Sequence, residues 1–357
     1  MGKKHYIIPI FVPHKGCPHD CIFCNQKRIT GTEGENVDAG IVEKTINEYL
    51  QTINSESAFI EVSFFGGSFT AIPMDYQNEL MGPAQNALQE GKINAVRLST
   101  RPDYINEAIL DNLKNHGASI IELGVQSLDE KVLGASGRGH SAEDVYKASR
   151  LIKEKGFVLG HQLMLGLPLD SQEKDIDSAK KSISMKPDIC RIYPTLVVKN
   201  TPMEDLYYKG KYKPYSLDEA VEIGKKVYSL YYASGIPVIR VGLQPTDNIN
   251  INGDIVAGPF HPSIRELVEG SLLNDMVYEV LSERDGDWEL HINPRYISRL
   301  YADKKRYFKK LVEKLYKNKI RVICDKTVPL EEILLKQGSH ETKLFLGTYM
   351  KKSASKL

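Results

Sequence analysis

Short apolar runs alternate with longer amphipathic stretches over the first two thirds of the chain. The runs are rich in β-branched and aromatic residues, which is typical of buried strands, and they lie at residues 6–12, 59–65, 95–99, 119–125, 157–165 and 189–193. The stretches between them have helical periodicity and lie at residues 39–53, 75–89, 105–116, 141–155, 172–183 and 216–233. Strand and helix repeated six times predict parallel β/α units with right-handed crossovers. The expected fold class is α/β, a partial (β/α)6 barrel of the TIM type.

The alternation changes near residue 240. In order, the sequence then predicts one more strand, a crossing rich in Gly and Asn, and two helices, at residues 238–241, 248–258, 262–269 and 297–317. We therefore expect a barrel over residues 1–245 and a small α+β region over residues 246–357 that caps the substrate-binding mouth.

Composition narrows the choice of partners. The chain has 357 residues, and no apolar run reaches the roughly 20 residues of a membrane helix, so we expect a cytoplasmic protein with no membrane partner. The 47 basic residues face 46 acidic ones, whereas proteins that hold a polyanion along several phosphates usually have a basic excess. Extended tRNA binding is thus not favoured. The basic residues of 304–310 form either a solvated helix surface or an anion-binding face.

Three cysteines lie close together near the start of the chain. Cys17, Cys21 and Cys24 have the spacing C-x3-C-x2-C, and the other two cysteines, Cys190 and Cys324, lie far away in sequence. An odd number of cysteines argues against a disulfide framework. A structural zinc site needs four ligands, of which His14 or His19 would be the fourth. A [4Fe-4S] cluster held by three cysteines instead leaves one iron open to an external molecule.

Residues with distinctive chemistry follow each predicted strand. In parallel barrels the functional residues lie at the C-terminal ends of the strands. The residues at these positions are Gly66, Gly67 and Ser68 after the second strand, Thr100 and Arg101 after the third, Gln126 and Ser127 after the fourth, Leu165 at the end of the fifth and Tyr193 at the end of the sixth. The sequence predicts that they surround one site.

Structural roles compete with binding roles at several of these positions. The glycines also suit a tight turn, Ser127 also suits a helix cap, and Arg101 and Arg138 are also compatible with surface cations. Glu122 and Arg191 lie on otherwise apolar strands, where a buried charge needs a partner or a function. They predict either an ion pair or a contact with the substrate.

Phe23 immediately precedes the third cysteine, and the resulting pattern C-x3-C-x-aromatic-C resembles the signature of the radical S-adenosylmethionine (SAM) superfamily. This resemblance implies that Cys17, Cys21 and Cys24 hold a [4Fe-4S] cluster whose open iron chelates the amino and carboxylate groups of SAM. It also implies that an electron from an external donor, such as flavodoxin or ferredoxin, cleaves SAM to a 5′-deoxyadenosyl radical.

The same resemblance assigns roles to the residues at the strand ends. Arg138 is favoured for the SAM carboxylate because its planar fork suits it. From their positions alone, at the end of the last barrel strand and in the C-terminal segment, Tyr193 and His261 are expected to act on the substrate. The residues that the resemblance places around SAM are Phe23, Gly66, Gly67, Ser68, Thr100, Arg101, Gln126, Ser127, Arg138 and Leu165.

Several segments are similar to one branch of that superfamily, the Elongator catalytic-subunit family. They occur in order at residues 65–69, 99–104, 122–127, 138–140, 192–197 and 211–216. The residues after Val241 are expected to be too few for the acetyltransferase domain of Elongator members. The segment His261–Leu267 resembles short bacterial members instead.

The resemblance to those short members implies a small-molecule substrate. It favours a lyase that cuts queuine, a free modified base, to an aminomethyl-deazaguanine. Two alternatives stay open. One is a radical SAM enzyme that modifies the wobble base of tRNA, and the other is a non-catalytic zinc or iron-sulfur protein that binds RNA.

Overall fold

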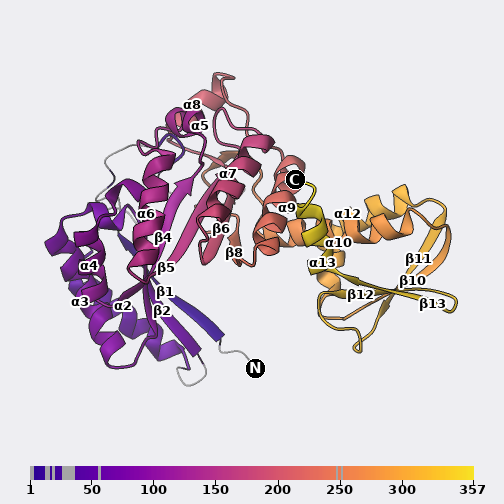
Figure 1. Cartoon of the computed structure of the whole chain (residues 1–357), viewed down its shortest axis with the longest axis horizontal. Helices are drawn as coiled ribbons and strands as arrows, with labels where there is room; N and C mark the ends of the chain where they lie inside the picture. Colours follow the sequence, from indigo (N-terminus) through magenta and orange to yellow (C-terminus); the bar gives the residue numbers. More distant parts are fainter. Residues whose placement is uncertain are drawn as a thin grey trace.

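The computed structural model describes residues 4–12, 17, 21–25, 37–54, 58–246, 248–250 and 252–357. In this part of the chain seven parallel strands form one curved sheet in the order β1-β2-β3-β4-β5-β6-β8 (Figure 1). Their bounds are Lys4–Val12, Ala58–Gly66, Ala95–Thr100, Ala118–Gln126, Val158–Leu165, Ile189–Pro194 and Val238–Val241. All six predicted strands and the seventh are present, so the partial barrel is confirmed.

Helices cover the outer face of this sheet (Figure 1). They are α2 (Ala39–Thr52), α3 (Met74–Gln89), α4 (Glu107–Asn115), α6 (Ala142–Glu154), α7 (Gln172–Ser184) and α9 (Leu217–Ala233). The short helix α5 (Glu130–Ala135) lies beside α8 (Pro202–Tyr208) instead (Figure 1). Strand β5 shows why the helices pack on the outer face. Its side chains alternate between the two faces of the sheet, and Leu159, Leu163 and Leu165 are buried in the core. Gln162 and Met164 lie on the opposite, inner face of the barrel. The predicted helices agree with these bounds to within two residues.

Charged side chains fill the inside of the barrel. Arg97 contacts Glu61, with its Nε 2.9 Å from a carboxylate oxygen, and it also pairs with Glu122. Arg191 holds Glu122 from the other side, with its Nε 2.6 Å from Oε2. All four residues are buried. The predicted Glu122–Arg191 ion pair is therefore present and belongs to a larger network that links β2, β3, β4 and β6.

Residues after β6 form a small cover over the strand ends. Strands β7 (Val197–Val198) and β9 (Ile255–Ala257) pair antiparallel, and helix α8 (Pro202–Tyr208) lies between them in sequence. Short 3-10 turns η2 (Phe69–Ala71) and η3 (Pro102–Tyr104) follow β2 and β3.

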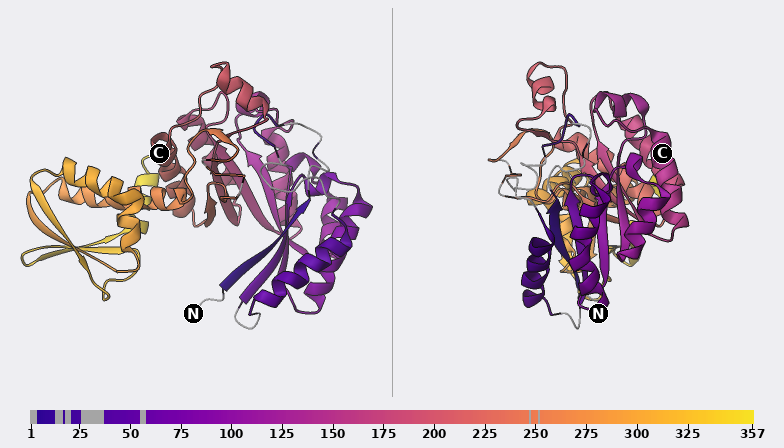
Figure 2. Two further views of the ribbon diagram at one scale, coloured as in Figure 1. Left: turned by 180° about the vertical axis from the view of Figure 1, so that it is seen from behind. Right: turned by 90° about the vertical axis from the view of Figure 1, so that its left-hand side faces the viewer.

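The C-terminal residues form a separate lobe beside α9 (Figure 2). It contains α10 (Ile264–Leu281), α11 (Ile297–Leu300), α12 (Ala302–Lys314) and α13 (Leu346–Ala354). Its sheet has the order β11-β10-β12-β13, with bounds Asn318–Cys324, Gly286–Ile292, Glu332–Gln337 and His340–Phe345. One face of this sheet, including the fully buried Trp288, packs against the helices.

Two predicted elements of this lobe were wrong. The helix predicted at residues 262–269 continues to Leu281. The continuous helix predicted at residues 297–317 is broken, because Asp303, Lys304 and Lys305 have positive φ values of 50°, 53° and 68°. No helix in the described ranges combines the length and apolar character that spanning a membrane requires.

Candidate active site

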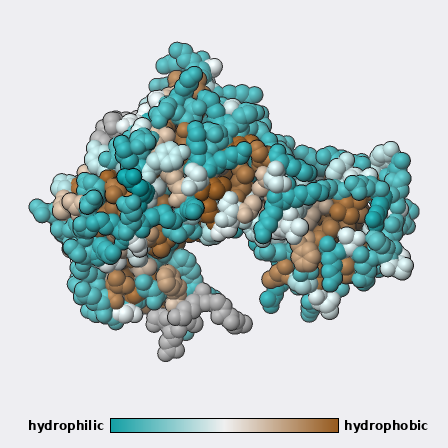
Figure 3. Space-filling view, viewed as in Figure 1, coloured by the Kyte–Doolittle hydropathy of each residue, from teal (hydrophilic) through white to brown (hydrophobic). Residues whose placement is uncertain are grey.

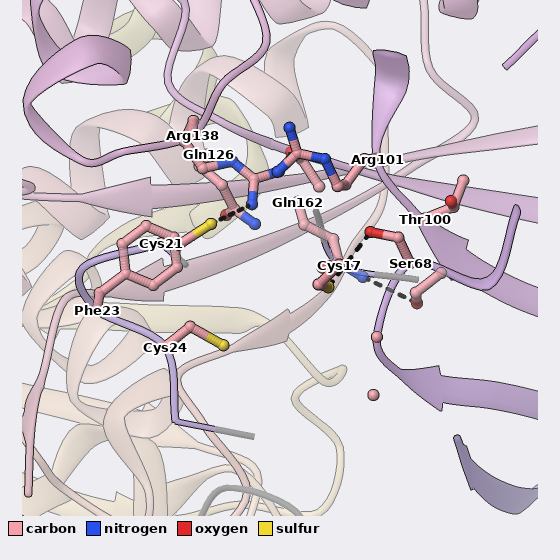
Figure 4. Close-up of a pocket in the computed structure, with 14 residues that line it drawn as sticks. Cys17, Cys21, Phe23, Cys24, Ser68, Thr100, Arg101, Gln126, Arg138 and Gln162 are labelled. Atoms are coloured by element: carbon pink, nitrogen blue, oxygen red, sulfur yellow. Dashed lines mark hydrogen bonds between the residues drawn. The ribbon is translucent and has the colours of Figure 1, made fainter. Parts of the chain in front are cut away.

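The ends of strands β2 to β5 and the cysteine loop surround a cavity of about 140 Å³ (Figure 4). All three cysteines and eight of the ten predicted SAM-binding residues line it. The lining residues are Cys17, Cys21, Phe23, Cys24, Gly66, Gly67, Ser68, Ser99, Thr100, Arg101, Gly124, Gln126, Arg138 and Gln162. The structure therefore brings together most of the residues that the sequence selected.

Backbone hydrogen bonds hold the second half of the cysteine loop. The Ile22 N–H donates to the Ser136 carbonyl at 3.1 Å, and the Ile22 carbonyl accepts from the Met203 N–H at 2.9 Å. The Cys24 N–H closes a turn onto the Cys21 carbonyl at 2.9 Å. Cys21 and Cys24 are thus fixed to the loop after α5 and to α8. Cys17 meets the loop after β2, where its Sγ lies 3.6 Å from Ser68 Oγ.

Arg138 lies at the centre of the cavity wall. One guanidinium nitrogen donates to Cys21 Sγ at 3.2 Å, and a second donates to the Gly124 carbonyl at 2.6 Å. A Cβ atom on Gly124 would lie 3.3 Å from Arg138 Nη2 and 3.1 Å from Gln126 Nε2. A glycine on β4 therefore leaves the space that both side chains use. Burial, followed by the charges of Arg138 and Arg101, lowers the pKa of nearby His140 to about 3, so this imidazole is neutral at pH 7.

Two residues of the wall have unusual backbone. Gln126 ends β4 with φ at 66°, a left-handed conformation that costs a non-glycine residue roughly 1 to 3 kcal/mol. Gly66 ends β2 with φ at 111°, and a Cβ there would lie 2.6 Å from the Val12 carbonyl oxygen. Such a clash explains the glycine. The strained Gln126 backbone is typical of a position kept for ligand binding.

Buried polar atoms without partners indicate that the cavity suits a polar ligand. Within the described residues, Arg138 Nε, Arg101 Nη1 and Gln126 Oε1 are buried and make no hydrogen bond. Folded proteins leave few such atoms unsatisfied, because each costs about 1 to 3 kcal/mol. Two cationic donors and one amide acceptor match the carboxylate and the donor groups of an amino acid moiety such as that of SAM.

The cysteines fit a cluster better than a single ion. In the described part of the chain, no three His, Cys, Asp or Glu side chains gather closely enough to hold one metal ion. In a [4Fe-4S] cluster each cysteine binds a different iron, so the sulfurs surround a larger body. Cys17, Cys21 and Cys24 line one cavity in that way (Figure 4). His14 and His19, the alternative zinc ligands, lie outside the described residues.

A second cavity of about 240 Å³ continues from the first. The two share Phe23, Cys24, Gly66, Ser99, Gln126 and Gln162. The further walls of the second cavity are mostly apolar and consist of Phe65, Met164, Tyr193, Pro194, Leu196, Val198 and Leu243. Tyr193 is the predicted substrate residue that lies here, and burial, more than any nearby charge, raises the pKa of its hydroxyl. It is therefore protonated at pH 7.

Three predicted site residues lie outside the two cavities, and a fourth is partly occupied by a neighbour. The Ser127 hydroxyl accepts from the Asp129 N–H and contacts Ser178, and Leu165 is buried in the core, so neither side chain lines the two cavities. The His261 Nδ1 accepts from the Ser263 N–H just before α10 and lines neither cavity. Arg101 does line the first cavity, but two of its nitrogens already donate to the Asp103 carboxylate at 3.0 Å.

Sequence reasoning missed Gln162, Ser99 and Gly124 as cavity residues. The Gln162 amide donates to Glu122 Oε2 at 2.9 Å and to Ser99 Oγ at 3.3 Å, so it joins the charged network to the cavity. The alternation of side chains along the strand could have identified Gln162. Every second residue of a strand faces the same side, so a glutamine among apolar residues indicates which side is the inner face.

Side-chain hydrogen bonds that were not predicted from the sequence hold the loop after β5. The Gly166 N–H donates to Asp175 Oδ1 at 3.3 Å, and the Gly166 carbonyl accepts from the Tyr212 hydroxyl at 2.6 Å. The Tyr215 hydroxyl donates to Asp175 Oδ2 at 2.9 Å. Burial, followed by the charge of the neighbouring Asp170, raises the pKa of Asp175 above its ordinary value.

Comparison with protein families identifies the class of enzyme. A model of the radical SAM superfamily matches residues 11–179, and a model of the radical SAM C-terminal domain matches residues 187–274. The chain belongs to the radical SAM superfamily. Members of this superfamily use a [4Fe-4S] cluster and SAM.

Two curated relatives and one solved structure refine the comparison. The chain is 31% identical over 255 residues to the tRNA uridine(34) acetyltransferase of Methanocaldococcus jannaschii, covering 61% of this chain and 47% of that protein. It is 27% identical over 263 residues to Elongator complex protein 3 of Bos taurus, covering 61% and 48%. The chain thus spans about half the length of these relatives. An N-terminally truncated Elp3 from Methanocaldococcus infernus has the same fold, with a TM-score of 0.59, 24% identity, and coverage of 79% and 64%.

We expect Arg138→Gln to weaken SAM binding by roughly 10- to 100-fold, because a charge-assisted hydrogen bond contributes about 1.5 to 3 kcal/mol. Calorimetric titration of SAM into the reconstituted protein measures the change. Iron content must be determined in parallel, because Arg138 also contacts Cys21. Arg150→Gln is the control, since Arg150 is exposed on α6 beside Glu154. Unchanged SAM affinity in Arg138→Gln with full iron content would contradict the assignment.

Proposed function

We propose that this radical SAM enzyme acts on a base, and that the wobble base of tRNA is its substrate. The observation that carries the proposal is the pair of joined cavities, one lined by the three cysteines and one with apolar walls next to it. The relatives named above favour the wobble position, since one of them is a uridine(34) acetyltransferase of tRNA.

The chain's own residues have separable tasks in this proposal. Cys17, Cys21 and Cys24 hold a [4Fe-4S] cluster, which when bound supplies the electron that cleaves SAM to a 5′-deoxyadenosyl radical. Arg138 and Gln126 bind the polar end of SAM. The apolar walls around Tyr193 exclude water from the neighbouring cavity, which protects a reactive radical from side reactions.

The size of the second cavity favours a single base. A volume of about 240 Å³ is below the range of roughly 300 to 1,000 Å³ typical for pockets of drug-sized ligands. Its aromatic and aliphatic walls suit a flat ring, and Gln162 and Tyr193 offer polar groups at its edge. A nucleotide flipped out of a tRNA loop would present such a ring.

Free queuine is a second candidate substrate for the same cavity. A detached base needs no contact outside the cavity, and its ring would meet the same walls. None of the comparisons named above points to queuine, so the lyase prediction rests on the resemblance to short bacterial proteins alone.

One anaerobic experiment separates the candidates. The cluster is reconstituted, and SAM and dithionite are added with either an unmodified tRNA transcript or queuine. Mass spectrometry follows 5′-deoxyadenosine, the digested nucleosides and the base. Substrate-dependent 5′-deoxyadenosine with a mass change at the wobble nucleoside supports the proposal. Loss of queuine with an unchanged tRNA would instead establish the lyase, and a mass change in neither substrate would contradict both.

A further inference from the structure

Arg240 is a cation on the inner face of the barrel. It lies on β8, where it pairs in register with Arg191 on β6. Neighbouring residues in register point to the same face of a sheet, so the Arg240 side chain shares the inner face with that of Arg191. The half-buried guanidinium donates to the neutral side-chain oxygen of Gln244 at 2.7 Å. It forms no ion pair with any residue that the structure describes.

The charges on this inner face do not balance. In the described strands it carries two acids and three arginines, namely Glu61, Glu122, Arg97, Arg191 and Arg240. Arg97 holds Glu61 at nitrogen–oxygen distances of 2.9 and 3.0 Å. Arg191 holds Glu122 at 2.6 and 3.0 Å. Arg240 is therefore an excess cation. Because a charge turned inward normally has a counter-charge, this guanidinium suits an anionic ligand.

Arg240 lies at the margin of the second cavity. Leu243, three residues further along the chain, lines that cavity, and so does Tyr193 on the neighbouring strand. Burial raises the pKa of the Tyr193 hydroxyl, and the charges of Arg191 and Arg240 act against that rise. The Arg240 guanidinium is thus close enough to act on groups in the cavity, although it is not part of the wall.

The inner face is open beside β8. Strands β1 and β8 are the two edges of the seven-stranded sheet, and in the part of the chain that the structure describes they do not pair with each other. Figure 1 places β8 next to the C-terminal lobe, and Figure 3 shows the molecule hollowed between that lobe and the barrel. The Gln244 side chain that holds Arg240 is exposed. A ligand that fills the second cavity can therefore extend past Arg240 toward solvent.

A nucleotide has the two parts that this arrangement matches. Its base is flat and uncharged and suits the apolar walls of the second cavity. Its phosphate is separated from the base by the sugar, so it would lie outside the cavity, where a planar guanidinium donates two parallel hydrogen bonds to it. A detached base such as queuine has no such anion. One phosphate contact needs no basic excess over the whole chain, so the net charge of +1 does not oppose it.

We propose that Arg240 binds a phosphate of the substrate nucleotide and so selects a nucleotide over a detached base. This inference rests on the proposed function, since it assumes that the base in the second cavity carries its sugar and phosphate. The phosphate belongs either to an RNA backbone or to a free nucleotide. The competing role is structural, in which Arg240 only ties β8 to the following loop through Gln244. The predicted role of residues 246–357 as a substrate cap stays a prediction.

The first test compares a ligand with and without its phosphate. Uridine 5′-monophosphate and uridine are titrated into the anaerobically reconstituted protein with SAM, and ligand-observed NMR measures both affinities. Uridine is the nucleoside named for one relative. We expect the wild type to prefer the monophosphate by about tenfold, because a charge-assisted hydrogen bond to phosphate is lost without it. Arg240→Gln should lose most of this preference, and Arg240→Lys, which keeps the charge without the fork, should be intermediate.

Two further variants separate phosphate binding from a structural role. Gln244→Ala removes the tie between β8 and the loop but leaves the Arg240 guanidinium, so it should keep the preference for the monophosphate. Arg150→Gln removes the same charge from the exposed face of α6 and should also keep it. Iron content and the midpoint of thermal unfolding, measured for every variant, show that each is folded and loaded. A preference lost equally in Gln244→Ala and Arg240→Gln would overturn the proposal in favour of the structural role.

The reaction with an unmodified tRNA transcript identifies the source of the phosphate. If it belongs to RNA, Arg240→Gln should raise the KM for tRNA by about tenfold and change kcat less, with Gln244→Ala unchanged. A lost preference for the monophosphate beside an unchanged KM for tRNA would assign the contact to a free nucleotide. Equal wild-type affinity for uridine and its monophosphate, together with an unchanged KM, would overturn the role of Arg240 and leave the proposed function standing. If the wild type alters queuine and not tRNA, both proposals fail.

Discussion

Replacing Cys21 by alanine is expected to abolish SAM cleavage and to remove the iron-sulfur absorption of the reconstituted protein. Cys21 is the most buried of the three cysteines and is held between the Arg138 guanidinium and the turn that leads to Cys24. A cluster that already lacks a fourth cysteine cannot lose another protein ligand and still be held in place. Formation of 5′-deoxyadenosine under dithionite, measured by liquid chromatography, should fall to the background of the assay.

The chain offers matched controls for this experiment. Cys324 is exposed on the C-terminal lobe and Cys190 is buried in the barrel core, and neither lines the cysteine cavity. Cys324→Ala and Cys190→Ala should both retain the cluster and SAM cleavage. Wild-type levels of 5′-deoxyadenosine from Cys21→Ala would refute the cluster assignment. Loss of activity in Cys324→Ala would show that the assay reports general damage.

Glu122→Gln is expected to destabilise the protein by about 3 to 5 kcal/mol at pH 7. Glu122 accepts hydrogen bonds from Arg191 and Arg97 inside the barrel, and the neutral amide would leave two buried guanidinium groups without their shared counter-charge. Removing one partner of a buried network costs about this much, whereas an exposed pair contributes about 0 to 1 kcal/mol. Equilibrium unfolding in urea measures the difference, and the exposed Glu143→Gln on α6 is the control.

The pH dependence provides a second check on Glu122. Burial alone would raise the pKa of this carboxyl, but the charges and hydrogen bonds of Arg191 and Arg97 outweigh it and lower the pKa below the ordinary value of 4.5. The ionised form therefore contributes stability above that ordinary value, and the contribution is lost as the pH falls through the lowered pKa. We expect the gap between wild type and Glu122→Gln to be largest at neutral pH and to shrink in acid. A constant gap would contradict the charge-based account.

Much of the site was predictable because its residues are marked locally. The cysteine spacing, the glycines after β2, and Arg138 between two glycines in sequence are patterns within a few residues of one another. The rule that parallel strands place their ends at one edge then gathers them into one site. The structure does line one cavity with eleven of the predicted residues, including Phe23 and Gln126.

At two predicted positions the side chain also has a partner within the protein. Ser127 was predicted to contact SAM, to cap a helix or to do both, and its hydroxyl accepts a hydrogen bond in the turn that begins α5. Most of the Arg101 guanidinium is occupied by Asp103, only two residues away.

The sequence by itself determined the elements and the faces of this protein. Hydrophobic period and cysteine spacing are local properties, so the strands and helices of the barrel and the candidate cluster ligands could be predicted from them. Only the tertiary structure decided which side chains from different strands meet. Arg97 bridges Glu61 and Glu122, and Gln162 reaches from that network to the cavity, because the sheet register sets them side by side. Register depends on the packing of the whole barrel, which no short stretch of sequence encodes.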